Sequence, residues 1–149
     1  MDKFKIINLP KLSFAHIFGA DNYHRNFPAR EGLLEITYIS KGSLPCIRGG
    51  VRYDATEGDV TCDFFDLPQQ FEADTPHEHH TVGFFMDFCP SNEGIYIPYL
   101  TKSTYALAPI RERIDEIIRR KTIAPEDDIT LAGLFLTLLG ELADYHKTR

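Results

Sequence analysis

Turn-forming residues divide the chain at short intervals up to about Ile97. The turn residues include Gly19, Pro28, Gly32, Gly42, Gly49, Gly50, Gly58, Pro68, Pro76 and Pro90. The segments between them have the length of strands and are rich in β-branched and aromatic residues, which is typical of a β-sandwich or β-barrel. We place strands at residues 13–18, 33–40, 44–48, 50–54, 59–65, 69–74, 79–88 and 95–97.

Two of these segments carry more specific information. Residues 46–53 predict a tight hairpin around Gly49 and Gly50, because a Gly-Gly pair tolerates the positive φ angles of such a turn. Residues 80–88 (HTVGFFMDF) are apolar on both faces, so this strand should be covered on both sides. A second layer must therefore pack on the sheet.

The C-terminal third supplies helices for that layer. Apolar residues recur at three- and four-residue spacing from Leu107 to Ile118, basic residues follow at 119–121, and Pro125 ends this first helix. Asp127 or Asp128 then caps a second helix that runs to about Tyr145.

Composition excludes several classes of protein. The 149 residues carry a formal charge of −6, which does not favour nucleic-acid binding by this part of the chain. The three cysteines are far apart and predict no disulfide framework, and we interpret Cys46, Cys62 and Cys89 as small core residues. No apolar run resembles a signal peptide or a membrane span, so we expect a cytoplasmic protein without membrane contact.

An ordered set of motifs resembles a known family. Residues 33–42 (LLEITYISKG) are followed by Tyr53 to Val60 (YDATEGDV), then by Pro68-Gln69, and then by residues 76–80 (PHEHH). Over residues 25 to 145 this order resembles the N-terminal domain of AraC-type transcription regulators. The resemblance implies a mainly β fold, with a cupin-like (jelly-roll) barrel over residues 1–100 and two helices in a dimerisation segment over residues 101–149.

In that family the domain binds a small effector, forms a homodimer through its C-terminal helix and is joined to a DNA-binding domain. The 149 residues contain no helix-turn-helix segment. The chain therefore resembles the sensor part of such a regulator, either as a fragment or as a naturally short homologue. We expect DNA binding only through that absent C-terminal domain.

The cupin resemblance raises the question of a metal centre. Glu35 and Gly42 match the second half of the first cupin signature, but residues 28–31 lack its two histidines, and Gln69 follows Pro68 where the second signature has a histidine. A transition metal needs three or four N, O or S donors, so we expect neither a metal nor another cofactor. Residues 77–80 (HEHH) are the alternative metal site, but in a strand only His77 and His79 share a side, and we favour a polar turn with His80 hydrogen-bonded near the barrel.

The expected effector site lies inside the barrel. The cupin pattern points Glu35 inward with Thr37 and Ile39, and we assign the His80 face of the strand 79–88 to the same interior, with Arg30 and Arg48 as candidate partners of the carboxylate. The alternative is an interior filled by its own side chains. The candidate ligand-binding residues are Arg30, Glu35, Thr37, Arg48, Gln69, His80 and Phe84.

The second helix is apolar around most of its circumference. We expect one stripe to pack on the core and the other on a second copy of the chain; the alternative is a helix sunk between the barrel and the first helix. The candidate dimer residues are Ala132, Leu136, Leu139, Gly140 and Ala143. Three functions follow as hypotheses: a non-enzymatic effector sensor, a stand-alone cupin enzyme such as an isomerase or oxygenase, and a dimerisation module with a filled barrel.

Overall fold

Antiparallel β-strands form most of the protein, and two helices at the C-terminal end cover one face. The computed structural model describes residues 3–147. Its strands are β1 (Lys3–Ile6), β2 (Lys11–Ala20), β3 (Tyr23–Phe27), β4 (Leu33–Arg48), β5 (Val51–Thr56), β6 (Val60–Asp63), β7 (Gln69–Ala73), β8 (His77–Phe85), β9 (Phe88–Pro90), β10 (Ile95–Tyr96) and β11 (Leu100–Thr101). A short 3-10 turn (Tyr105–Leu107) precedes α1 (Ala108–Ile123) and α2 (Asp128–Lys147).

The long strand β4 organises the barrel because it belongs to both of its sheets. Its first half pairs with β6 and β8, and its second half pairs with β5 and β7. The strand changes sheets near Gly42, where the pairing with β8 shifts between Ile39 and Lys41. Gly42 has a φ of 72°, and a Cβ atom there would collide with the backbone oxygen of Pro76, so this bend requires glycine.

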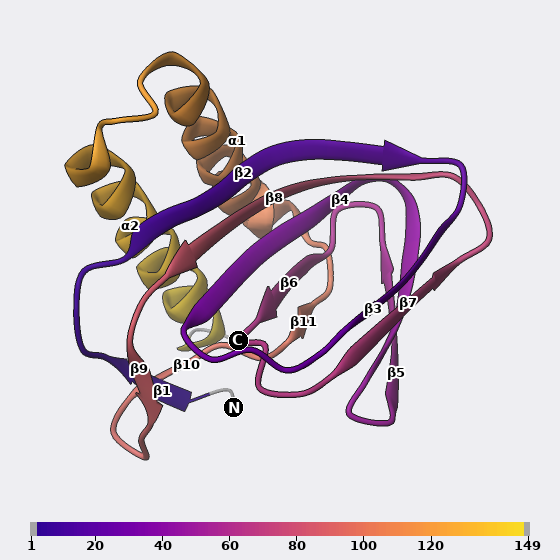
Figure 1. The fold of residues 1–149 in the computed structure, drawn as a ribbon, viewed down its shortest axis with the longest axis horizontal. Coiled ribbons are helices and arrows are strands. Elements are labelled where there is room, and N and C mark those ends of the chain that lie inside the picture. Colours follow the sequence, from indigo (N-terminus) through magenta and orange to yellow (C-terminus); the bar gives the residue numbers. More distant parts are fainter. Residues whose placement is uncertain (1–2, 148–149) are drawn as a thin grey trace.

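Three further strand pairings complete the barrel around β4, while β1, β9 and β10 form a separate three-stranded sheet. β2 pairs with β8, β3 with β7, and β11 with β6 (Figure 1). The predicted hairpin is confirmed: Cys46 pairs with Tyr53, and the turn residues Gly49 and Gly50 have φ angles of 57° and 81°. The cupin-like β-barrel followed by two helices is therefore the fold that the sequence predicts.

The helices pack on the outer face of β2, β4 and β8, as Figure 1 shows. The side chains of Leu34 and Ile36 from β4 and of Val82 and Phe84 from β8 meet the apolar faces of both helices in one buried cluster. Asp127 accepts a hydrogen bond from the backbone N–H of Thr130 and caps α2 as predicted. Within residues 3–147, neither helix combines the length and the apolar character needed to cross a membrane.

Gly58 and Asp59 have a structural role at the turn between β5 and β6. Gly58 has a φ of 88°, and the Asp59 carboxylate accepts hydrogen bonds from the backbone N–H groups of Thr56 and Ser103 at 2.8 and 2.7 Å. Lys102 Nζ lies 2.6 Å from the same carboxylate. The motif thus ties the β5–β6 turn to the segment that leads into α1.

Candidate ligand-binding site

The barrel encloses a cavity of about 330 Å³, so its interior is not filled by its own side chains. This is within the size range of small-molecule sites. Six Phe and Tyr rings contribute to the wall: Phe14, Tyr23, Phe27, Phe65, Phe71 and Tyr99. Four of the predicted ligand-binding residues lie on this wall together: Arg30, Glu35, Thr37 and Gln69.

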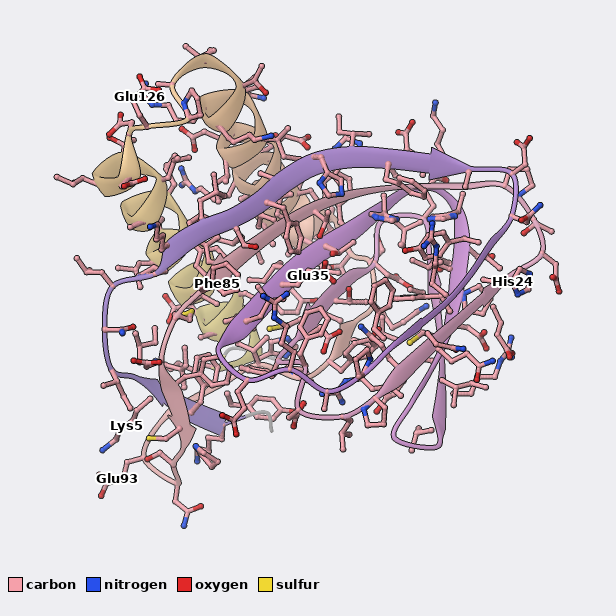
Figure 2. The ribbon with its side chains drawn as sticks, viewed as in Figure 1. Lys5, His24, Glu35, Phe85, Glu93 and Glu126 are labelled. Atoms are coloured by element: carbon pink, nitrogen blue, oxygen red, sulfur yellow. The ribbon has the colours of Figure 1, made fainter. Side chains whose placement is uncertain are left out.

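Glu35 is the acidic group of the cavity wall, and it projects inward from β4 (Figure 2). Burial raises the pKa of Glu35 to about 8, the negative charge of Asp63 adds to the rise, and a hydrogen bond from Thr81 opposes it. The Glu35 side chain is therefore largely protonated near neutral pH. Neither Arg30 nor Arg48 forms the ion pair that the sequence suggested, so that expectation is wrong.

Arg48 lies behind the cavity wall and contacts two carboxylates and an aromatic ring there. Its Nη2 atom lies 2.5 Å from Oδ1 of Asp66, its Nε atom lies 3.7 Å from Oδ1 of Asp63, and its guanidinium stacks over the ring of Tyr99. Gln69 donates a hydrogen bond to the Asp63 carboxylate. Arg48 therefore holds the groups that orient Gln69 and does not itself line the cavity.

Arg30 and Phe65 separate the cavity from a second, open depression of about 750 Å³ on the surface. Phe65 has a φ of 54°, an uncommon conformation for a bulky residue. Two hydrogen bonds of 2.8 Å hold it: its N–H donates to Asp63, and its carbonyl accepts from the N–H of Arg30. These two residues therefore line both the cavity and the surface depression.

His77 and His79 share one side of β8, as the strand geometry predicts. Their rings stack with centroids 5.0 Å apart, and Nε2 of His77 lies 2.8 Å from Nδ1 of His79. His79 lines the cavity, and burial lowers its pKa to about 3, with positive charge on His77 adding to the effect. Both rings are therefore neutral near pH 7.

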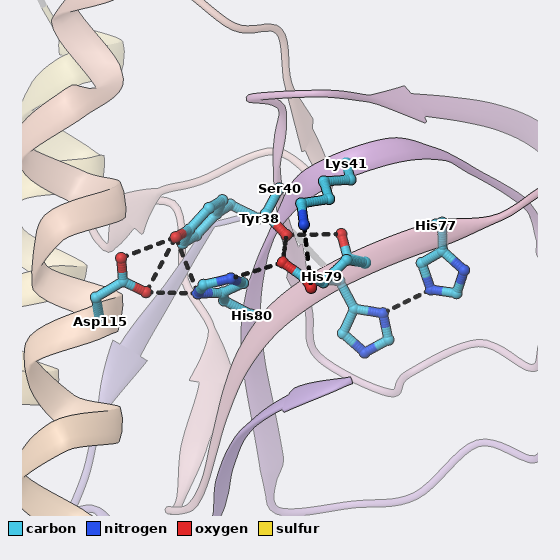
Figure 3. Close-up of polar contacts among 8 residues, drawn as sticks. Tyr38, Ser40, Lys41, His77, His79, His80 and Asp115 are labelled. Atoms are coloured by element: carbon cyan, nitrogen blue, oxygen red, sulfur yellow. Dashed lines mark hydrogen bonds and ion pairs between the residues drawn. The ribbon is translucent and has the colours of Figure 1, made fainter. Parts of the chain in front are cut away.

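His80 points the other way, so the assignment of its face to the barrel interior is wrong. Its Nδ1 atom lies 2.6 Å from Oδ1 of Asp115 on α1, and the hydroxyl of Tyr38 donates to the same carboxylate at 2.8 Å (Figure 3). Glu78 Oε1 lies 3.5 Å from His80 Nε2. His80 is hydrogen-bonded, as expected, but outside the barrel and against a helix.

Phe84 lies on the same outer face and does not line the cavity. Its ring stacks on Phe135 of α2 with a centroid distance of 4.1 Å. The inward face of β8 instead carries His79, Thr81 and Gly83. Thr37 on β4 faces the cavity and pairs with Thr81 on β8, and their hydroxyls lie 2.7 Å apart, so both side chains are on the same face of the sheet. Sequence reasoning missed Phe14, Tyr23 and His79. The β4–β8 register places His79, whereas Phe14 and Tyr23 also require the pairing of β2 with β8 and of β3 with β7.

The candidate dimer residues on α2 divide into two groups. Ala132, Leu139 and Ala143 are buried inside the chain itself, so their assignment to a dimer interface is wrong. Leu136 is half-buried and Gly140 is exposed, with open space around its Cα atom. α2 therefore buries more of its circumference within the chain than expected, because part of the stripe assigned to a second copy packs on the protein's own core.

Two further findings concern metal ligands and cysteines. Among residues 3–147, no group of three or more His, Cys, Asp or Glu side chains is placed to hold a metal ion. Cys46 and Cys62 are buried free thiols, but Cys89 is exposed, which corrects its assignment to the core.

No protein-family model matches the sequence, and no curated protein matches it. Among solved structures, ToxT from Vibrio cholerae, solved with an unsaturated fatty acid bound, aligns over 93% of this chain and 58% of its own with 10% identity and a TM-score of 0.47. The EutQ protein from Clostridium difficile aligns over 52% of this chain and 62% of its own with 17% identity and a TM-score of 0.43.

The Cupin_2 domain of an XRE family transcriptional regulator from Enterobacter cloacae aligns over 53% of this chain and 96% of its own, with 15% identity and a TM-score of 0.40. The chain spans less than two thirds of the EutQ and ToxT chains. The chain is a cupin-like β-barrel protein with an internal cavity.

Proposed function

We propose that the protein is a sensor domain that binds a small-molecule effector inside the barrel, as the N-terminal domain of an AraC-type transcription regulator does. The observation that carries this proposal is the cavity of about 330 Å³, in which aromatic walls surround a few converging polar groups. Such a combination of apolar surface and placed polar groups is characteristic of small-ligand sites.

The strands that line the cavity also contact the helices, which suits a sensor. On β4, Thr37 faces the cavity and the next residue, Tyr38, donates a hydrogen bond to Asp115 of α1. On β8, His79 faces the cavity and His80 contacts the same carboxylate. A ligand that moves either strand therefore changes a contact with α1 directly.

We also propose that the domain is not an enzyme. A cupin metal centre requires three or four donors, whereas Gln69 stands at the second-signature position and donates to Asp63. Glu35 is the acidic side chain on the cavity wall, and His79 on the same wall is stacked and hydrogen-bonded to His77. This donor set favours binding over metal-dependent catalysis.

A homodimer through α2 remains part of the proposal, restricted to the surface that the chain leaves free. That surface, the α2 strip, consists of Gly133, Leu136 and Gly140. The small glycines would allow two helices to approach closely across a two-fold axis. DNA binding is assigned to a further domain, since the acidic chain itself lacks the charge for it.

A cavity-filling variant tests the proposal. Ala55 lines the cavity and is buried, so Ala55→Phe should occupy the space that a ligand needs. A compound library is screened by thermal shift, and compounds that stabilise the wild type should fail on Ala55→Phe but act on Ala124→Leu, a control at the end of α1. Binding that survives in a folded Ala55→Phe protein would contradict the barrel as the site.

A further inference from the structure

The carboxyl group of Glu35 lacks a positively charged partner. Within residues 3–147 no Lys, Arg or His nitrogen forms an ion pair with it, and its strongest charged influence is the negative Asp63. Arg48 is engaged by Asp63 and Asp66. Arg30 is exposed, and its guanidinium lies 5.1 Å from the centre of the Phe85 ring. A buried carboxyl group without a cation is unfavourable when ionised.

The walls around Glu35 are suited to a cation. The face of an aromatic ring carries a partial negative charge, and a cation within about 6 Å of such a face is attracted, most strongly when it is desolvated. Rings from β2, β3 and β7 share the cavity wall with Glu35, namely Phe14, Tyr23 and Phe71. Tyr23 and Tyr99 both interact electrostatically with Glu35.

We propose that the cavity binds a small organic cation, a primary ammonium group on an apolar body, with the ammonium at the Glu35 carboxylate and the body among the aromatic rings. This inference rests on the proposed function and names the ligand class of the same site. The ammonium donates hydrogen bonds to the carboxylate and supplies the positive charge that no described side chain provides.

An anionic ligand fits the same walls poorly. It would lie near Glu35 and Asp63, whose ionised forms repel it, while Arg30, a cation on the cavity wall, is exposed and screened by solvent. A neutral ligand could hydrogen-bond to protonated Glu35 but would gain nothing from the aromatic faces beyond apolar contact. The carboxyl groups and aromatic rings of the wall therefore favour a cationic ligand over an anionic or a neutral one.

Binding of an ammonium ion should release a proton. The protonated Glu35 carboxyl group loses its proton to the buffer, and the resulting carboxylate pairs with the ammonium. Since the pKa of Glu35 is about 8, affinity should rise up to about tenfold per pH unit between pH 6 and pH 8.

The other titratable groups around Glu35 have shifted pKa values of their own. His79 has a pKa of about 3 and stays neutral. Burial raises the pKa of Tyr23, Tyr99 and Cys62 above their ordinary values. Burial also raises the pKa of Asp63, while the backbone N–H of Phe65 and the charge of Arg48 hold it down.

Three probes of similar size and different charge test the inference: 2-phenylethylamine, 3-phenylpropionate and 2-phenylethanol. Each is titrated into the full chain by calorimetry at pH 6, 7 and 8, in buffers of different ionisation enthalpy that report the protons released. The variants are Glu35→Gln, which keeps the shape without the charge, and Glu57→Gln, the same change at an exposed position.

The expected result is tighter binding of the amine than of the other two probes, release of close to one proton at pH 6, and loss of the pH dependence in Glu35→Gln alone. Stronger binding of the propionate or the alcohol in the cavity would overturn the ligand class and leave the proposed function standing. Absence of binding by all three probes at millimolar concentration would count against both.

Discussion

The Nδ1 atom of His80 lies 2.6 Å from Oδ1 of Asp115, and this contact joins strand β8 of the barrel to helix α1. Tyr38 completes the link, because its hydroxyl donates to both carboxylate oxygens at 3.0 and 2.8 Å. The three residues lie directly behind the cavity wall. They form a polar connection between the cavity wall and α1, next to the apolar cluster that packs both helices on the sheet.

The Tyr38 hydroxyl should contribute measurably to stability. Tyr38→Phe removes hydrogen bonds to a charged group while keeping the ring, which should lower the free energy of unfolding by about 1–2 kcal/mol in urea denaturation. Tyr105→Phe is the matched control, since Tyr105 is 91% exposed. Equal effects of the two substitutions would contradict the role of the link.

Glu35 should make stability fall as the pH rises. The folded protein holds the Glu35 proton up to a pKa of about 8, whereas the unfolded chain releases it near 4.5, so this contribution is complete below pH 4.5 and is lost through pH 8. The slope can reach about 1.4 kcal/mol per pH unit. Glu35→Gln should abolish this alkaline slope in urea denaturation at pH 5 to 9; an unchanged slope would show that Glu35 is ionised.

His79 should have the opposite effect at acid pH. Its folded pKa of about 3 lies below the unfolded value of 6.5, so its contribution is present above pH 6.5 and is lost as the pH falls towards 3. His79→Phe should reduce the acid loss of stability, measured by urea denaturation at pH 7 and pH 5. The exposed His24→Gln serves as control, and an equal reduction there would contradict the prediction.

Gly83 keeps space for the Phe14 ring on the cavity wall. A Cβ atom at Gly83 would collide with that ring, so Gly83→Ala should push Phe14 into the cavity and destabilise the fold by about 1–3 kcal/mol. Gly19→Ala, where the nearest atom is 3.6 Å away, is the control on the paired strand β2. Denaturation and binding of a cavity ligand measure both effects; full affinity in Gly83→Ala would refute the collision.

Helix α2 permits a test that separates folding from dimerisation. Leu139 is 1% exposed, so Leu139→Arg should unfold the chain, because it buries an unpaired charge. Gly140→Arg projects from the α2 strip into open space and should leave the circular dichroism spectrum unchanged. If the strip forms a homodimer, light scattering should then show a folded monomer; a dimer that persists in Gly140→Arg would exclude this interface.

Local chemistry explains what the sequence determined by itself. The Gly49–Gly50 turn sets the register of β4 with β5, and Pro125 followed by Asp127 separates α1 from α2, because each depends on a few neighbouring residues. The cupin resemblance pointed Glu35 inward, and the alternation of a single strand then placed Thr37 on the same wall of the cavity. Strands β1 and β3 were missed, since their sequences lack a clear apolar alternation and their partners β9 and β7 complete them.

Only the tertiary structure decided which faces of β8 and α2 point where. Both faces of β8 are apolar enough to be buried, so periodicity could not choose between His80 and His79; the pairing of Thr37 with Thr81 and the cover of two helices put His79 into the cavity and His80 against Asp115. In α2, packing between the barrel and α1 buries Ala132, Leu139 and Ala143, which a helical projection leaves available to a partner. The orientation of an element that is apolar on two sides depends on the elements packed around it, and its own sequence does not contain that information.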